Sequence, residues 1–278
     1  TSNRYLPILG GQISAAVVHR NRTTGKVTSY YHRLANVIAL PGGGIGVNQG
    51  DLDELQAKLS VSRWPFLVVS YGEHGIPDKK PPEELAIAKI NQQMQELEIR
   101  ALEELTNANA TGPDRMLVVD GSIQFTNIPL KNRSWLSNVV GVSKSFRTNL
   151  VFTRDKKEIG ALLVENLRRV GQRTPAFRYD LRGNAYSVWY LRIRERRHSD
   201  KPLSGIVKLE KLLLTEDELE YGLDSDVVNN LSLSVLGERF VTPYGRDERW
   251  ANHLYPVYLA ERYQRMRLMS EIQFLKLF

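Results

Sequence analysis

The stretch LVVDGSIQF, residues 117–125, places an aspartate directly after an apolar run. Apolar residues followed by a turn-forming Asp-Gly pair are typical of a buried β-strand that ends at the aspartate. The charge of this aspartate, Asp120, is costly to desolvate unless a metal ion, a salt bridge or a local cap compensates it. The common structural alternative is a side chain that caps backbone N–H groups of the turn. The rest of the sequence has to decide between these roles.

The segments around this strand predict a mixed α/β protein of one domain. Two β-rich stretches come first, residues 13–20 and 27–40, and the turn-forming segment NRTTGK between them predicts a hairpin. A helix is expected from about Glu84 to Asn107, and strands and helices alternate after it. A terminal helix is expected to begin near Pro256, because proline is favoured at the first helical position. This order indicates a mixed sheet flanked by helices, with a C-terminal helix.

Composition indicates a chain that can bury a core and that favours acidic partners. Of the 278 residues, 42% are hydrophobic, and 38 Lys and Arg against 31 Asp and Glu give a formal net charge of +7. Such a balance favours polyanions such as DNA or RNA. The absence of cysteine excludes disulfides and thiolate metal sites and fits a reducing compartment. The sequence has no long apolar segment, and TSNRYLPILGG lacks the basic-then-apolar pattern of a signal peptide. We therefore expect a cytoplasmic protein with no membrane partner.

Two glutamates are predicted to point inward from helices. At roughly 100° per residue, Glu98 falls within an apolar stripe of the first long helix, formed by Ile87, Ile90, Met94, Leu97, Ala101 and Leu105. Glu261 lies on an apolar stripe of the terminal helix. Hard divalent cations need oxygen ligands brought in from separate elements, so both glutamates are candidate metal ligands. Ion pairs with neighbouring arginines are the structural alternative.

Basic and aromatic residues are candidates for contacts with a polyanion. Lys144, in the strand segment GVSK, stands at a strand position comparable to that of Asp120. Arginines that could hold a phosphate backbone, or form only a solvated face, occur at Arg192, Arg194, Arg196, Arg197, Arg262 and Arg265. Trp135 and Trp250 stand in predicted loops, where they could stack on an unpaired base or anchor the loop on the core. No Walker-type loop is present, so we expect no nucleotide cofactor.

Taken in order along the chain, these segments resemble the NurA nuclease family. The matching pieces extend from about Glu83 to Arg267 and read LEIRALEEL, LVVDGSIQ, VVGVSK, GQRTPAFRY, SVWYLRI, GIVKLE and LYPVYLAERYQR. The resemblance implies an RNase H-like sheet within a NurA-like nuclease domain over residues 1–278. It also implies a homodimer that docks on a HerA-type hexameric ATPase and processes DNA ends in double-strand break repair.

The resemblance also implies a set of site residues. In the family, acidic residues bind two divalent ions, typically Mn²⁺ with Mg²⁺ as the alternative, which support phosphodiester hydrolysis. Asp120 matches the aspartate of the DGS motif, Glu98 the glutamate of the preceding helix, and Lys144 the lysine of the G-x-x-K strand. Glu261 stands where the family has a histidine or an aspartate, and glutamate can still ligate either ion.

One position departs from the family pattern. The family's first strand carries an aspartate in another DGS-like motif, whereas this sequence has Gly10 or Gly11 there. Either another acid such as Glu73 or Asp51 takes its place, or the ligand belongs to a segment outside this sequence. The alternative function is a catalytically degenerate scaffold that acts by binding DNA or an ATPase partner. An Argonaute-like PIWI domain shares the same core, but this chain is too short to add the usual guide-binding domain.

Overall fold

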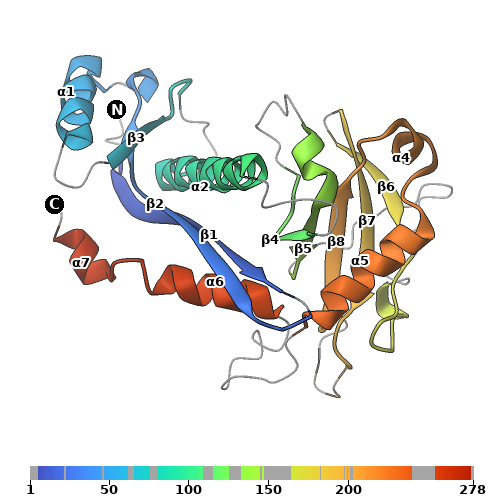
Figure 1. The fold of residues 1–278 in the computed structure, drawn as a ribbon. Helices are drawn as coiled ribbons and strands as arrows, with labels where there is room; N and C mark the ends of the chain where they lie inside the picture. The colour runs from blue at the N-terminus through green and yellow to red at the C-terminus, as the bar shows by residue number, and fades with distance from the viewer. Residues whose placement is uncertain are drawn as a thin grey trace. The chain divides into compact units, whose positions relative to one another are not determined.

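The chain contains two compact units, each built around its own β-sheet (Figure 1). Residues 1–104 and 259–278 form the first unit, and residues 105–258 form the second. The computed structural model describes residues 6–21, 23–45, 47–61, 66–75, 80–108, 115–124, 133–144, 146, 164–181, 183–196, 198, 200, 203–239 and 254–276. The predicted α/β class, a mixed sheet flanked by helices, is confirmed, and the structure contains two such sheets. The assignment of residues 1–278 to one nuclease domain stays a prediction.

The first unit holds a three-stranded sheet in the order β1-β2-β3. Its strands are β1 (Leu9–Arg20), β2 (Val27–Pro41) and β3 (Phe66–Tyr71), and its short elements are η1 (Gly43–Ile45), α1 (Gln49–Ser60) and α7 (Glu271–Leu275). Two helices cross the boundary between the units, α2 (Pro82–Asn107) and α6 (Tyr255–Arg265). β1 and β2 pair antiparallel, which confirms the predicted hairpin, and β3 joins β2 in parallel.

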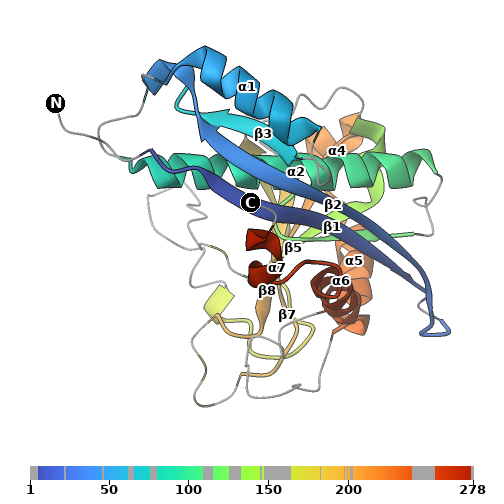
Figure 2. The ribbon, with the colours of Figure 1, turned by 90° about the vertical axis from the view of Figure 1, so that its left-hand side faces the viewer.

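Side chains alternate across β2, and each face of the sheet therefore receives a different layer. Ile38 and Leu40 pack with Leu52 of α1 and with Phe274 of α7, whereas Ala39 packs with Ala86 of α2. Figure 2 shows α1 lying beside β3. The first sheet is thus covered by helices on both faces.

The C-terminal segment forms two helices where the sequence predicts one. α6 ends at Arg265, and α7 begins after Ser270, whose side chain accepts a hydrogen bond from the Gln273 N–H in a capping box. The Met269 N–H donates to Gln12 of β1 at 2.8 Å instead of continuing the helix. A cap and a tertiary hydrogen bond therefore outweigh the apolar periodicity that favours one long helix.

The predicted helix preceding the Asp120 strand is confirmed as α2, but its predicted inward stripe is wrong in part. Ile87 and Met94 are 44% and 37% exposed, and the buried residues of α2 are Ala86, Ile99, Ala101 and Leu102. Apolar residues occur on more than one side of this helix, so periodicity alone does not fix the side that meets the sheet.

The second unit holds a five-stranded sheet in the order β4-β5-β8-β7-β6. Its elements are β4 (Leu117–Asp120), η2 (Arg133–Asn138), β5 (Val139–Ser143), β6 (Phe177–Leu181), β7 (Asn184–Arg192), β8 (Ile206–Leu212), α4 (Glu216–Tyr221) and α5 (Ser225–Gly237). β4 and β5 are parallel, and the other neighbours are antiparallel. The strand that ends at Asp120 is therefore at one edge, and β8 is central.

The two faces of this sheet have different partners. On one face, Trp189 and Leu209 pack against Val228 and Val235 of α5. The fully buried Trp189 indole N–H donates to Ser232 of α5 at 3.0 Å, which satisfies the polar atom of a large core side chain. On the other face, Tyr190 packs with a separate apolar cluster formed by Val164, Leu167 and Ile206. Both faces of β7 are therefore buried.

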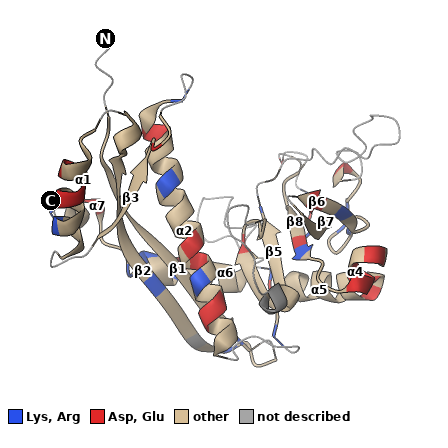
Figure 3. Cartoon of the chain, turned by 90° about the horizontal axis from the view of Figure 1, so that it is seen from above, with Lys and Arg blue, Asp and Glu red and all other residues tan. Residues whose placement is uncertain are grey.

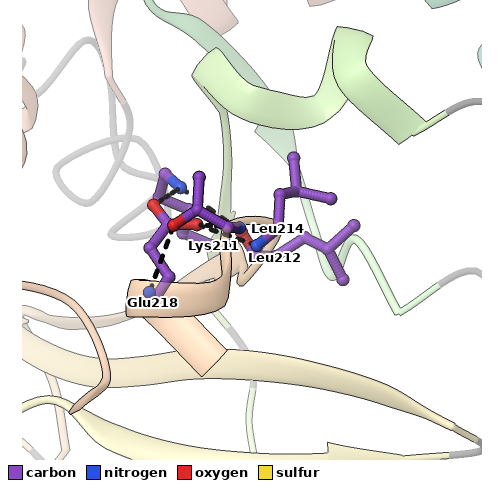
Figure 4. A network of polar contacts seen from close by, with 5 residues as sticks. Lys211, Leu212, Leu214 and Glu218 are labelled. Carbon is purple, nitrogen blue, oxygen red and sulfur yellow. Dashed lines mark hydrogen bonds and ion pairs between the residues drawn. The ribbon is translucent and has the colours of Figure 1, made fainter. Parts of the chain in front are cut away.

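A partly buried ion pair fixes the connection from β8 to α4 (Figure 4). This helix is rich in acidic residues (Figure 3). The Lys211 ammonium donates to one oxygen of Glu218 at 2.8 Å, and the Leu214 N–H donates to the other at 2.8 Å. Burial acts to raise the pKa of Glu218, but the hydrogen bonds from Lys211 and Leu214 outweigh it, so the pKa lies below its usual value.

No helix among the described ranges is both long and apolar enough to span a bilayer.

Candidate active site

The structure brings together Asp120 and Lys144, the two strand-end residues that the sequence singles out. β4 and β5 are parallel neighbours with Asp120 opposite Val142, and Lys144 follows β5 directly. The ends of adjacent parallel strands meet at one edge of a sheet, so both side chains reach the same place. The Lys144 ammonium lies 3.0 Å from Oδ2 of Asp120. Of the roles open to Asp120, the structure shows a salt bridge.

The pair is accessible from solvent. The Asp120 side chain is 40% exposed and the Lys144 side chain is 21% exposed. Ion pairs exposed to this degree contribute at most about 1 kcal/mol to folding. The juxtaposition is therefore poorly explained by stability, and it offers a carboxylate and an ammonium side by side to an incoming phosphate.

Two glycines shape the turn that follows Asp120. Gly121 donates its N–H to the Val142 carbonyl at 2.9 Å and has a φ of +124°, a conformation that side-chain-bearing residues rarely adopt. Gly141 of β5 lies under this turn. A Cβ on Gly141 would come within 2.9 Å of the Gly121 carbonyl oxygen and 3.0 Å of Ile123 Cγ2. The glycine of the G-x-x-K segment thus leaves room for the main chain of the DGS segment.

Gly141→Ala should therefore destabilise the protein by about 1–3 kcal/mol, because either β5 or the turn after Asp120 must move to accept the methyl group. Urea unfolding followed by circular dichroism measures this change. Gly11→Ala is the matched control, since Gly11 also lies in a strand and its Cβ would meet no atom within 4 Å. Equal stabilities of the two variants would contradict this account of Gly141.

Sequence reasoning missed the most highly connected charged residue near this turn, Glu210 of β8. Glu210 is 0% exposed, and its two oxygens receive hydrogen bonds from Ser122, from the Ile123 N–H and from Gln124, besides an ion pair with Lys208. The available signal was the spacing of Lys208 and Glu210, two charged residues two positions apart in a strand whose other residues are apolar except Lys211. Charged residues at such a spacing project from one face and require partners there.

The other two predicted acids belong to the first unit. Glu98 lies in α2 and Glu261 in α6, and both are partly buried. Asp120 and Lys144 belong to the second unit, so a ligand set of three carboxylates stays a prediction.

The donor chemistry of Asp120 suits Mn²⁺ or Mg²⁺, which prefer carboxylate oxygens. Within the described part of the chain, however, no group of three or more His, Asp or Glu side chains is placed to hold a metal ion. Asp120 thus provides one suitable ligand, and the described residues do not assemble a complete site around it.

The predicted DNA-binding residues fall into three groups. Arg192 is 1% exposed, and its guanidinium donates to the carbonyls of Leu167, Arg194 and Ser204, which assigns it a structural role. Burial, together with the nearby charges of Arg196 and Arg194, lowers the pKa of Arg192. Arg194 is mostly buried and pairs with Asp200 at 2.7 Å.

The second group is exposed and consists of Arg196, Arg262 and Arg265. The third lies outside the described residues: all of Arg197 and Trp250, and the side chain of Trp135, whose backbone belongs to η2. Three arginines therefore remain as described surface candidates for phosphate contacts.

The fold and the site define an α/β protein with a carboxylate and a lysine at adjacent ends of parallel strands. A family model described as NurA domain matches residues 59–261, which is well over half of the chain. The chain therefore belongs to the NurA family, a family of nucleases involved in DNA-end processing. A search of curated proteins found no match. The family match includes Asp120, Lys144, Glu98, Glu261 and Glu210.

Proposed function

We propose that this protein is a divalent-metal-dependent deoxyribonuclease that processes DNA ends in double-strand break repair. The observation that carries the proposal is the Asp120–Lys144 pair, which lies inside the matched region at the end of the DGS strand. The proposal extends to a HerA-type hexameric ATPase as the partner, a homodimer as the working form and the cytoplasm as its location.

The residues of this site suit phosphodiester hydrolysis. We propose Asp120, Glu98 and Glu261 as ligands for Mn²⁺ or Mg²⁺, an ion that would neutralise phosphate charge and lower the pKa of a bound water. The Lys144 ammonium would donate to a phosphate oxygen as negative charge develops on it in the transition state. Arg196, Arg262 and Arg265 would hold the DNA backbone through charge and not through base identity.

The test is degradation of end-labelled linear duplex DNA by the purified protein with Mn²⁺, Mg²⁺ or EDTA, alone and with a HerA-type ATPase. We expect cleavage that requires the ion and that increases with the ATPase. If neither ion supports cleavage, with or without the ATPase, and DNA binding is intact, the nuclease proposal fails.

A second function, a binding scaffold without catalysis, is favoured by the first strand of the chain. Gly10 and Gly11 lie in β1, before the matched residues 59–261, and the resemblance read from the sequence sets them against the family's first aspartate. The possible substitutes are not beside them in the sheet register. Gly11 is opposite Val37, whereas Glu73 follows β3 beyond its last pair at Pro41 and Tyr71, and Asp51 lies in the first turn of α1.

Gly11→Asp separates the two functions. A Cβ on Gly11 meets no atom within 4 Å, so β1 accepts an aspartate without a steric clash. If catalysis was lost with the first aspartate, Gly11→Asp should raise Mn²⁺-dependent cleavage by at least about tenfold over the wild type, since a missing ligand would be restored. Gly11→Asn is the matched control because it adds the same volume without the charge. Metal-dependent cleavage by the wild type that neither variant increases would argue against the scaffold reading.

A further inference from the structure

Glu210 is a charged residue on the central strand of the sheet, where an ionised side chain is least expected. It is 0% exposed, and burial of a carboxylate is costly unless charges and hydrogen bonds compensate it fully. Its position on β8 is opposite Gly141 of β5, the glycine that leaves room for the turn after Asp120. The register therefore directs the Glu210 carboxylate toward that turn.

Each oxygen of the Glu210 carboxylate has two polar partners. Oε2 accepts from the Ser122 hydroxyl at 2.7 Å and from the Ile123 N–H at 3.2 Å. Oε1 accepts from the Gln124 amide at 2.9 Å and pairs with the Lys208 ammonium. The Gln124 N–H in turn donates to Ser122 at 3.2 Å. Each of the three residues from Ser122 to Gln124 is thus held by Glu210.

This network leaves Asp120 between two fixed points. Before it, β4 is held in the sheet by its pairing with β5, and immediately after it the Gly121 N–H is bonded to the Val142 carbonyl. Beyond Gly121, the chain is anchored on Glu210. Burial and the nearby charge of Glu210 raise the pKa of Tyr190 on the adjacent strand to about 12, so that hydroxyl stays neutral beside the network at ordinary pH.

We propose that Glu210 is a positioning residue for Asp120: it anchors Ser122, Ile123 and Gln124 so that the Asp120 carboxylate is held at the sheet edge beside Lys144. The inference rests on the proposed nuclease function and names a residue that does not touch DNA. Catalytic groups depend on the groups behind them, and loss of such a partner typically costs about 10–100-fold in activity.

The test is Glu210→Gln, which keeps the side-chain shape but removes the charge shared by its four donors. We expect kcat for duplex cleavage to fall by at least about tenfold while KM for DNA changes by less than about twofold, because Glu210 is buried away from the substrate. We also expect the backbone amides of Ile123 and Gln124 to exchange with deuterium at least about tenfold faster.

Glu218→Gln is the matched control. It breaks a partly buried carboxylate–lysine pair that is also anchored on β8, through Lys211, whose side chain projects from the opposite face of that strand. A residue that only stabilises the fold would lower the melting temperature in either variant and leave kcat per folded molecule unchanged. If Glu210→Gln does not fold, Ser122→Ala removes one of the hydrogen bonds to Glu210 instead. We then expect kcat to fall by at least about threefold while KM changes little.

The outcomes separate the inference from the proposed function. If the wild type cleaves DNA, and the variant that folds keeps wild-type kcat per folded molecule, the positioning role is overturned and the nuclease remains. If the wild type cleaves no DNA under any metal condition, the proposed function fails and the inference fails with it. A lower kcat at unchanged KM, with faster exchange after Gly121 and no such change in Glu218→Gln, supports the positioning role.

Discussion

Asp120→Asn is expected to reduce cleavage of duplex DNA by at least about a thousandfold, because the substitution keeps the shape of the side chain and removes the charge on which the proposed chemistry depends. DNA affinity should stay the same or rise, since a negative charge is removed from the surface that we propose to face phosphates. Folding should be little affected, because the Asp120 side chain is 40% exposed and its ion pair is worth at most about 1 kcal/mol.

The measurement is single-turnover cleavage at saturating Mn²⁺, with DNA affinity determined in parallel by fluorescence anisotropy. Asp180→Asn is the matched control, because Asp180 lies in β6 at the opposite edge of the same sheet and also pairs with a basic residue, Arg178 at 3.1 Å. Both variants change the net charge equally. Metal-dependent cleavage that survives in Asp120→Asn would show that another residue carries the chemistry.

The strand-end positions of Asp120 and Lys144 could be predicted because they depend on local patterns. Each residue follows a short apolar run, and such runs form strands whose ends meet when they are parallel neighbours. The hairpin of β1 and β2 was predictable for the same reason, since turn-forming residues separate two β-rich stretches. Local pattern therefore identified the two strand-end positions, whereas the parallel pairing of β4 with β5 that brings them together is seen only in the fold.

Glu210 could not be found in the same way. Its role depends on the neighbours of β8, which is the last strand of its sheet in sequence and the central one in space. Ser122 and Gln124 are 88 and 86 residues away in the chain. Local periodicity contains no information on which strand a buried carboxylate will meet.

The arginine cluster illustrates a second limit of sequence reading. RIRERR is a strongly basic stretch in sequence, but Arg192 is the last residue of β7 and is buried, whereas Arg196 lies beyond the strand and is exposed. The Arg192 guanidinium donates hydrogen bonds to the carbonyls of Leu167, Arg194 and Ser204, which compensate its burial. A cluster of like charges in sequence is therefore not a single surface in the fold.

Lys144→Met is expected to lower kcat for duplex cleavage by about a hundredfold, because an ammonium that stabilises developing phosphate charge is typically worth that much or more. Methionine is close to lysine in aliphatic length and suits this position, because the Lys144 side chain is only 21% exposed. Lys144→Arg keeps the charge and should retain part of the activity, although its planar head cannot match the lysine geometry.

The Lys144 variants also distinguish catalysis from two simpler roles. If the pair with Asp120 were only a surface salt bridge, Lys144→Met would cost at most about 1 kcal/mol of stability and leave cleavage unchanged. If Lys144 only attracted DNA, the loss would appear in KM, with a salt dependence of binding that is shallower by about one unit. Lys58→Met, which breaks the exposed pair with Glu54 in α1, controls for net charge. A fall in kcat at unchanged KM that Lys58→Met does not reproduce would assign Lys144 to the transition state, whereas unchanged kcat would leave Asp120 without its proposed partner.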